Sequence, residues 1–155
     1  MLIAKNLTYK VNKNYLQKMN SNIKLNQVTK NDMSFLHELL KNKDPNSNIS
    51  HKKMPSYDEH VKFVLSEPYT IWYIIECDKK NAGAIYLSKQ DEIGISINNH
   101  YEYEKIAEPA LKLLMELNPR KRYLVNTSPK DTRVQEFLLK KGFTVLEHVY
   151  EMKIC

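Results

Sequence analysis

The chain has 155 residues, of which 42% are hydrophobic, and this size and composition suit one globular domain with a single core. No apolar run approaches the roughly 18 residues that a membrane-spanning helix needs, and no clear signal-peptide pattern is present, so we expect a cytoplasmic protein with no membrane contact. The formal net charge of +6 favours an anionic partner, which could be a phosphorylated cofactor, a sugar nucleotide or nucleic acid.

The first part of the chain is polar and then becomes periodic. Residues 1–22 are rich in asparagine and lysine, and we interpret them as an extension that precedes a domain at 23–155. Apolar and polar residues alternate at 23–28, which predicts a half-buried strand. Thr29 then has the residue type of a helix N-cap, and the predicted helix runs to about Lys43.

The middle of the chain predicts a second helix followed by a meander of strands. Ser56 and Glu59 stand three residues apart, which is the spacing of a capping box at a helix start. Runs with strand character follow at 70–77, 81–88 and 92–98. Because the connections between these runs are short, the strands are expected to be antiparallel.

The last part of the chain predicts two further helices and two strands. A helical pattern covers 105–117, and a short strand is predicted at 122–126. Asp131 is placed to cap a helix that ends at Gly142, and the final strand is predicted at 143–152.

Three passages stand at distinctive places in this order, NAGAIYL at 81–87, EIGISI at 92–97 and FLLKKGF at 137–143. With the element order they resemble the GNAT superfamily of acyl-CoA N-acyltransferases over about residues 23–153. The resemblance implies an α/β (α+β) fold with a mixed, mostly antiparallel sheet of about six to seven strands. It also implies a V-shaped splay between strands four and five and about four flanking helices.

The resemblance places an acyl-CoA, most simply acetyl-CoA, in the cleft that this splay opens. Main-chain groups of Ile95 and Ile97 would bond the pantetheine amides. Lys105, Ile106 and Ala107, which open the third helix, would bind the pyrophosphate, because free amides and the helix dipole attract anions.

The predicted phosphate loop departs from the family motif. That motif is Gln or Arg, two residues, Gly, one residue, then Gly or Ala, and the matching positions are Glu102, Lys105 and Ala107, of which only Ala107 conforms. Glu104 and Glu108 add further negative charge near a site for phosphates. Two interpretations stay open: Lys105 replaces the glycine amides with a charged contact, or acyl-CoA binding has been lost.

Glu92 heads the fourth strand beside the expected cleft and is the candidate base for the amine proton, directly or through water. The tyrosine that the family often uses as a general acid corresponds to Leu138, so that group is absent here. Asn126, at the end of strand 122–126, could bond pantetheine or the acceptor, or could simply cap the following turn.

The candidate acceptor contacts are His51, Lys53, Tyr73 and Tyr86. The first two lie in a basic loop that would suit an anionic amine, such as a nucleotide-linked amino sugar. The alternative, which the residue types favour, is that these are surface or packing side chains. The histidines lack the spacing of a metal site, so no metal is expected.

Two functions are therefore compared. The first is an N-acyltransferase that passes an acyl group to a primary amine by direct attack on the thioester. The alternative is a GNAT-fold ligand-binding or interaction protein that has lost acyl-CoA binding. Nucleic-acid binding rests on net charge alone and is disfavoured, and a homodimer is left open.

Overall fold

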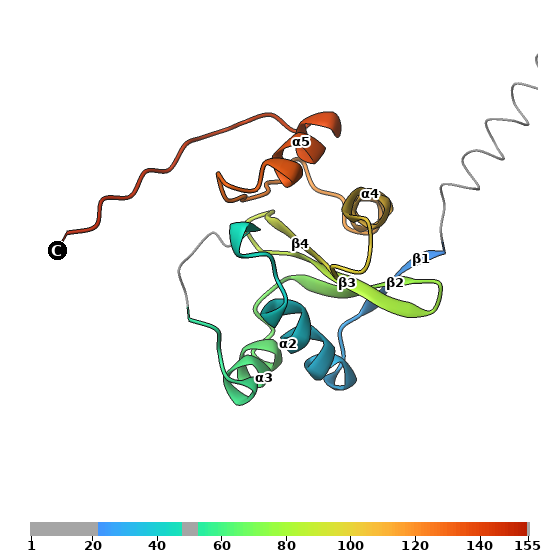
Figure 1. Cartoon of the computed structure of the whole chain (residues 1–155). Coiled ribbons are helices and arrows are strands. Elements are labelled where there is room, and N and C mark those ends of the chain that lie inside the picture. The colour runs from blue at the N-terminus through green and yellow to red at the C-terminus, as the bar shows by residue number, and fades with distance from the viewer. Residues whose placement is uncertain (1–21, 48–52, 155) are drawn as a thin grey trace, which may run out of the picture.

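The computed structural model describes residues 22–47 and 53–154 (Figure 1). The extension predicted at 1–22, apart from its last residue, and the candidate contact His51 lie outside the described residues. The strands are β1 (Ile23–Gln27), β2 (Ile71–Cys77), β3 (Lys80–Leu87) and β4 (Ile93–Ile97). The helices are α2 (Met33–Lys41), α3 (Tyr57–Leu65), α4 (Tyr103–Leu117) and α5 (Thr132–Lys140), with 3-10 turns η1 (Lys30–Asp32) and η2 (Pro45–Ser47).

The sheet has the order β1-β2-β3-β4, and each neighbouring pair is antiparallel, as the meander predicted. The hairpin between β2 and β3 turns through Asp78 and Lys79, whose φ angles of 49° and 65° match the twist of a tight hairpin. Figure 1 shows α2 and α3 on one face of the sheet and α4 and α5 on the other.

Each face of the sheet carries its own core, because successive residues of a strand point to opposite sides. On the side of α4 and α5, buried Ile75 and Ile85 of the sheet pack with Leu114 and Phe137. On the side of α2 and α3, buried Ile74 packs with residues such as Leu36 and Val64. None of the described helices is long and apolar enough to cross a membrane.

The helix starts agree with their sequence signals. The Ser56 hydroxyl accepts a bond from the Glu59 amide while the Glu59 carboxylate accepts one from the Ser56 amide, which confirms the predicted capping box. Thr29 caps η1, which leads into α2, and Asp131 caps α5. The exception is α4, which begins at Tyr103, two residues before the predicted start.

Two predicted strands are wrong. Segment 122–126 makes one parallel bridge, between Leu124 and Glu92, and 143–152 forms no strand at all. In the latter, Val149 and Tyr150 are 87% and 89% exposed, and Figure 1 shows the segment running away from the helices. A strand needs a neighbour to satisfy its backbone, and this segment has none among the described residues. The described sheet therefore has four strands rather than six to seven.

Candidate functional site

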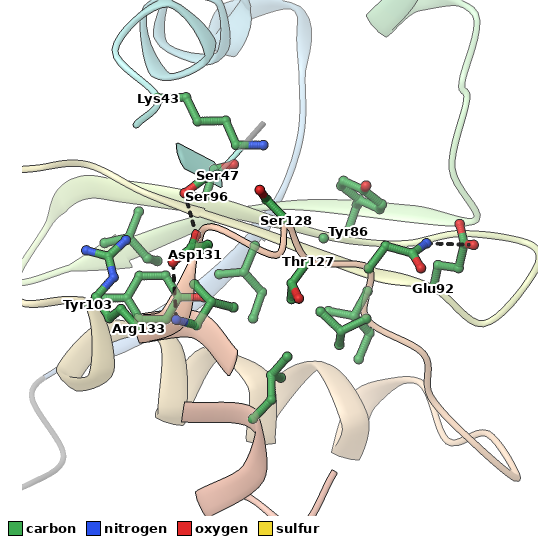
Figure 2. Close-up of a pocket in the computed structure, with 18 of the residues that line it drawn as sticks. Lys43, Ser47, Tyr86, Glu92, Ser96, Tyr103, Thr127, Ser128, Asp131 and Arg133 are labelled. Carbon is green, nitrogen blue, oxygen red and sulfur yellow. Dashed lines mark hydrogen bonds between the residues drawn. The ribbon is translucent and has the colours of Figure 1, made fainter. Parts of the chain in front are cut away.

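A cleft of about 190 Å³ lies between β4 and residues 125–128 (Figure 2). The whole of β4 lines one wall, and the chain that follows Leu124 lines the other. Side chains from the end of α2, from Tyr103 at the start of α4 and from α5 complete the lining. The family resemblance implies that the cofactor lies here, between the fourth strand and the segment predicted as the fifth.

One edge of β4 pairs with β3, and the other edge, which faces the cleft, is unpaired beyond Ile93. The Ile93 N–H donates to the Leu124 carbonyl at 2.8 Å, and the Leu124 N–H donates to the Asp91 carbonyl at 2.9 Å. Beyond these bonds, no backbone hydrogen bond between described residues joins 94–97 to 125–128. Because main-chain groups alternate along a strand, those of Ile95 and Ile97 face the same edge as Ile93. They are therefore free to bond an extended ligand.

Glu92 stands at the end of the cleft where the two walls still meet. Its Oε1 accepts a hydrogen bond from Asn126 Nδ2 at 3.0 Å, so the two walls are joined by these side chains. The Glu92 N–H donates to Ser88 Oγ at 3.1 Å, which fixes the backbone on which the carboxylate stands. The structure thus brings together two residues that the sequence assigned separately, Glu92 and Asn126.

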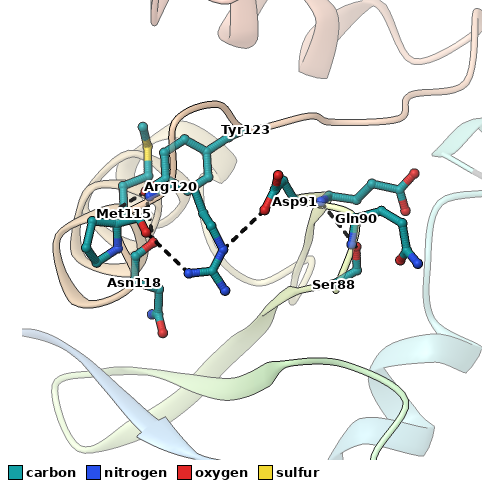
Figure 3. A network of polar contacts seen from close by, with 9 residues as sticks. Ser88, Gln90, Asp91, Met115, Asn118, Arg120 and Tyr123 are labelled. Atoms are coloured by element: carbon teal, nitrogen blue, oxygen red, sulfur yellow. Dashed lines mark hydrogen bonds and ion pairs between the residues drawn. The ribbon is translucent and has the colours of Figure 1, made fainter.

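The turn that carries Glu92 is also braced from the other side (Figure 3). Arg120 Nε pairs with Asp91 Oδ1 at 3.1 Å, and the Arg120 N–H donates to the Tyr123 hydroxyl at 3.0 Å. That hydroxyl lies 2.9 Å from the Asn118 carbonyl, to which it can donate its proton. This network ties the turn to the end of α4 and to the segment that leads to Leu124.

Tyr86 reaches the cleft by lying across Gly94, its partner on β4. A Cβ at Gly94 would overlap the Tyr86 ring, so the absence of a side chain there makes room for the tyrosine. The ring stacks on Tyr69 with centroids 3.7 Å apart and an interplanar angle of 3°. Burial raises the pKa of Tyr86, and the negative charge of Glu92 raises it further, although the Tyr69 hydroxyl opposes the shift. The phenol is therefore protonated at neutral pH.

The start of α4 differs from the sequence prediction. Lys105 Nζ pairs with Glu102 at 2.6 Å, and the Lys105 side chain is 72% exposed and does not line the cleft. Ile106 and Ala107 are buried in the core. Because the helix begins at Tyr103, the amides without a partner inside the helix are those of residues 102–105. The free amides thus include that of Lys105 but not those of Ile106 and Ala107, the other two positions that we had assigned to phosphate.

The cleft also contains charged and polar residues that the sequence analysis did not assign to a ligand. Asp131 is buried, and it accepts hydrogen bonds from the Ser47 hydroxyl and from the Val134 N–H. Burial lowers the pKa of Lys43, while the charge of Asp131 opposes that shift. Arg133 lies with its guanidinium carbon 4.6 Å from the centre of the Tyr103 ring. The sequence held a signal only for Asp131, as a helix cap.

The other candidate contacts lie elsewhere. The Tyr73 hydroxyl accepts a hydrogen bond from Asn118 Nδ2 at 3.3 Å, and the ring packs on the core beside α4. Trp72, its neighbour, packs on the core beside α2 and α3. We had named Tyr73 as a candidate acceptor contact, and neither ring lines the cleft. Lys53 is exposed and does not line the cleft either.

No family model and no curated protein matches the chain. Solved structures do match it. A domain from Methanocaldococcus jannaschii has a TM-score of 0.74 at 19% identity, over 85% of this chain and 94% of that chain. The ribosomal-protein alpha-N-acetyltransferase RimL, in complex with coenzyme A, has a TM-score of 0.68 at 17% identity, over 83% and 84%. The spermidine/spermine N-acetyltransferase SpeG from Vibrio cholerae has a TM-score of 0.67 at 16% identity, over 88% and 86%. The chain has the GNAT fold that these acetyltransferases share.

Proposed function

We propose that the protein is an acyl-CoA-dependent N-acyltransferase, most simply an acetyltransferase, that acts on a primary amine. The observation that carries the proposal is the unpaired edge of β4 at Ile95 and Ile97, inside a cleft that separates β4 from residues 125–128. RimL and SpeG, two of the similar structures, are named as N-acetyltransferases, and RimL holds coenzyme A.

The free edge suits pantetheine because that arm is extended and carries two amide groups. Such a chain can pair with an exposed strand edge as an additional strand, using main-chain hydrogen bonds. The single bridge between Glu92 and Leu124 joins the two walls at one end of the cleft. In the proposed complex the thioester lies toward that end and the phosphates lie toward the start of α4.

The proposed reaction is a direct transfer. The amine nitrogen attacks the thioester carbonyl, a C–N bond forms, and the C–S bond breaks to release the CoA thiolate. Glu92 takes a proton from the amine, directly or through water, and Asn126 holds the carboxylate in place. A proton then returns to the thiolate, so the products are an amide and the free thiol of coenzyme A.

A second function has specific support. Leu138, at the position of the family's general acid, is buried and lines the cleft, so it offers no proton there. The start of α4 has a lysine in place of the motif glycine, and that lysine already pairs with Glu102. These departures favour the alternative of a GNAT-fold binding protein without catalysis.

Isothermal titration calorimetry with coenzyme A and acetyl-CoA separates the two functions, because the alternative protein has lost acyl-CoA binding. We expect both compounds to bind, and we expect acetyl transfer to at least one amine in a panel that includes amines with carboxylate or phosphate groups. If neither compound binds at millimolar concentration, the acyltransferase is excluded. Binding of acetyl-CoA with turnover of at least one amine of the panel would exclude the alternative.

Glu92→Gln tests the assigned base. We expect it to lower the rate of transfer at neutral pH while leaving the affinity for coenzyme A unchanged, because the carboxylate takes the amine proton and does not hold the cofactor. Glu116→Gln is the matched control, since Glu116 is an exposed carboxylate on α4 that lies outside the cleft. An unchanged rate for Glu92→Gln would remove Glu92 as the base.

A further inference from the structure

The start of α4 is rich in charge, and most of that charge is already paired. Glu102 pairs with Lys105 at 2.6 Å on the helix itself. Glu104 pairs with Lys140 at 3.2 Å, and Glu108 pairs with Lys141 at 2.6 Å, so the end of α5 neutralises the other two carboxylates. These three lysines have carboxylate partners, and none of them lines the cleft.

Two other cations do line the cleft. Lys43, which follows α2, and Arg133, at the start of α5, have no carboxylate within ion-pair distance among residues 22–47 and 53–154. In Figure 2 Lys43 lies above Asp131 and Arg133 lies to its left, while Glu92 lies at the far end of the cleft. One end of the cleft therefore has two cations and one carboxylate, and the other end has the carboxylate of Glu92.

The segments that carry the two cations both contact the start of α4 or the turn before it. Arg133 is 4.6 Å from the ring of Tyr103, the first residue of that helix. On the opposite wall, Asn99 Nδ2 donates to the Asn42 carbonyl at 3.0 Å, which ties the residue before Lys43 to the turn that precedes α4. The chain after α2 and the start of α5 thus each carry one cation near the end of β4 that leads to α4.

Asp131 lies near both cations but leaves them with a net positive charge. Its oxygens are occupied by the Ser47 hydroxyl and the Val134 N–H. The burial that lowers the pKa of Lys43 also means that water solvates its ammonium poorly. An anion placed between the two cations would restore the interactions that Lys43 loses on burial.

We propose that Lys43 and Arg133 form a two-cation site for the diphosphate of coenzyme A. In this proposal Lys43 and Arg133, and not Lys105, take the place of the glycine-rich amide loop. This inference rests on the proposed function, and it names the groups that hold the cofactor. A guanidinium binds two phosphate oxygens at once, and an ammonium binds as a compact point charge. Such side chains supply charge from both walls where a glycine loop would supply main-chain N–H groups.

Calorimetry with three probes tests the site: coenzyme A, pantetheine, which lacks the diphosphate, and inorganic pyrophosphate. The variants are Lys43→Gln and Arg133→Gln, alone and combined, and Lys105→Gln is the matched control. Each single variant should weaken coenzyme A by roughly 10- to 100-fold, the usual effect of losing a hydrogen bond to a charged group. The double variant should lose pyrophosphate binding, while pantetheine affinity stays unchanged throughout. Lys105→Gln should bind all three probes as the wild type does.

Proton uptake on ligand binding distinguishes a direct contact by Lys43 from a purely structural role. A structural role would give no proton uptake by Lys43. Bound phosphates should raise the pKa of Lys43 again, so binding takes up a proton in the pH range between the free and bound values. Affinity should fall as the pH rises through that range. Calorimetry in buffers of different ionisation enthalpy detects this proton, and it should disappear in Lys43→Gln.

The outcomes separate this inference from the proposed function. If wild type binds coenzyme A, and Lys43→Gln and Arg133→Gln bind it equally well, the two-cation site is refuted and the acyltransferase stands. If wild type binds pyrophosphate in a manner that requires both cations, but binds neither coenzyme A nor pantetheine, the anion site stands and the acyltransferase falls. If wild type binds none of the probes, both are refuted. Circular dichroism melting of each variant shows that it is folded.

Discussion

Gly94→Ala tests whether the packing of Tyr86 across β4 shapes the cleft. A methyl carbon at Gly94 would lie 2.5 Å from the Tyr86 hydroxyl oxygen and closer still to two ring carbons, where ordinary van der Waals contact is 3.4–4 Å. Tyr86 must therefore leave its position. To do so it must break its stacking with Tyr69.

The expected cost follows from these contacts. An aromatic pair contributes about 0.5–1.5 kcal/mol beyond its buried area, and overpacking costs about 1–3 kcal/mol. We therefore expect Gly94→Ala to lower the free energy of unfolding by about 1–3 kcal/mol. Gly83→Ala is the contrast, because a methyl there would overlap the Ser96 carbonyl oxygen and lie 3.1 Å from Ile97 Cα. Since those are backbone atoms, this second substitution should cost at least as much.

Urea denaturation of a double-mutant cycle measures the effect. Tyr86→Ala removes the ring that the new methyl would meet, so Gly94→Ala should cost much less in that background. Gly83→Ala should cost the same with or without Tyr86, because its obstacle is main chain. If the costs of Gly94→Ala and Tyr86→Ala are additive, the two residues do not interact and the reasoning is refuted.

Three further predictions concern a buried histidine on α3 and two residues that line the cleft. Burial and the nearby His37 lower the pKa of His60. The free energy of unfolding should therefore be highest above about pH 6.5 and should fall as the pH drops toward the lowered pKa of the folded state. In His60→Gln the urea midpoint should lose this dependence on pH. Asp131→Ala should cost about 1–3 kcal/mol of unfolding free energy, because α5 loses its cap and the Ser47 hydroxyl loses its acceptor, and an unchanged urea midpoint would contradict this. Asn126→Ala should slow acetyl transfer with no change in coenzyme A affinity by calorimetry, whereas weaker coenzyme A binding would make Asn126 a cofactor contact.

Features fixed by neighbouring residues could be predicted from the sequence. The capping box of Ser56 and Glu59 needs only a helix and a spacing of three residues, and both of its hydrogen bonds are present. The Asp131 cap and the left-handed Gly142, with φ of 90° after α5, are of the same kind. The antiparallel meander was predictable because short connections leave the strands no other arrangement.

Features that depend on distant partners could not be predicted in this way. The alternation at 143–152 is typical of a strand, but periodicity says nothing of whether a neighbouring strand is present. Segment 122–126 is apolar enough for a strand, yet its pairing with β4 stops at Leu124. The same limit applies to the cleft, where Glu92 and Asn126 are 34 residues apart and meet through a side-chain bond. Lys43 and Arg133 were two basic residues among 24, with no local pattern to mark them.

The ion pairs of the α4 glutamates change how these residues bear on a phosphate site. From the sequence they argued against a phosphate site, because like charges repel. In the structure Glu104 and Glu108 pair with Lys140 and Lys141, and each such exposed pair contributes about 0–1 kcal/mol. These pairs join the C-terminal end of α5 to α4, and Arg133 at the other end of α5 lies on Tyr103. Glu104 and Glu108 therefore help to hold α5, the helix whose Arg133 lines the cleft. A glycine-free α4 start and an acyl-CoA site are compatible if the charge comes from α5 and from the residue after Asn42.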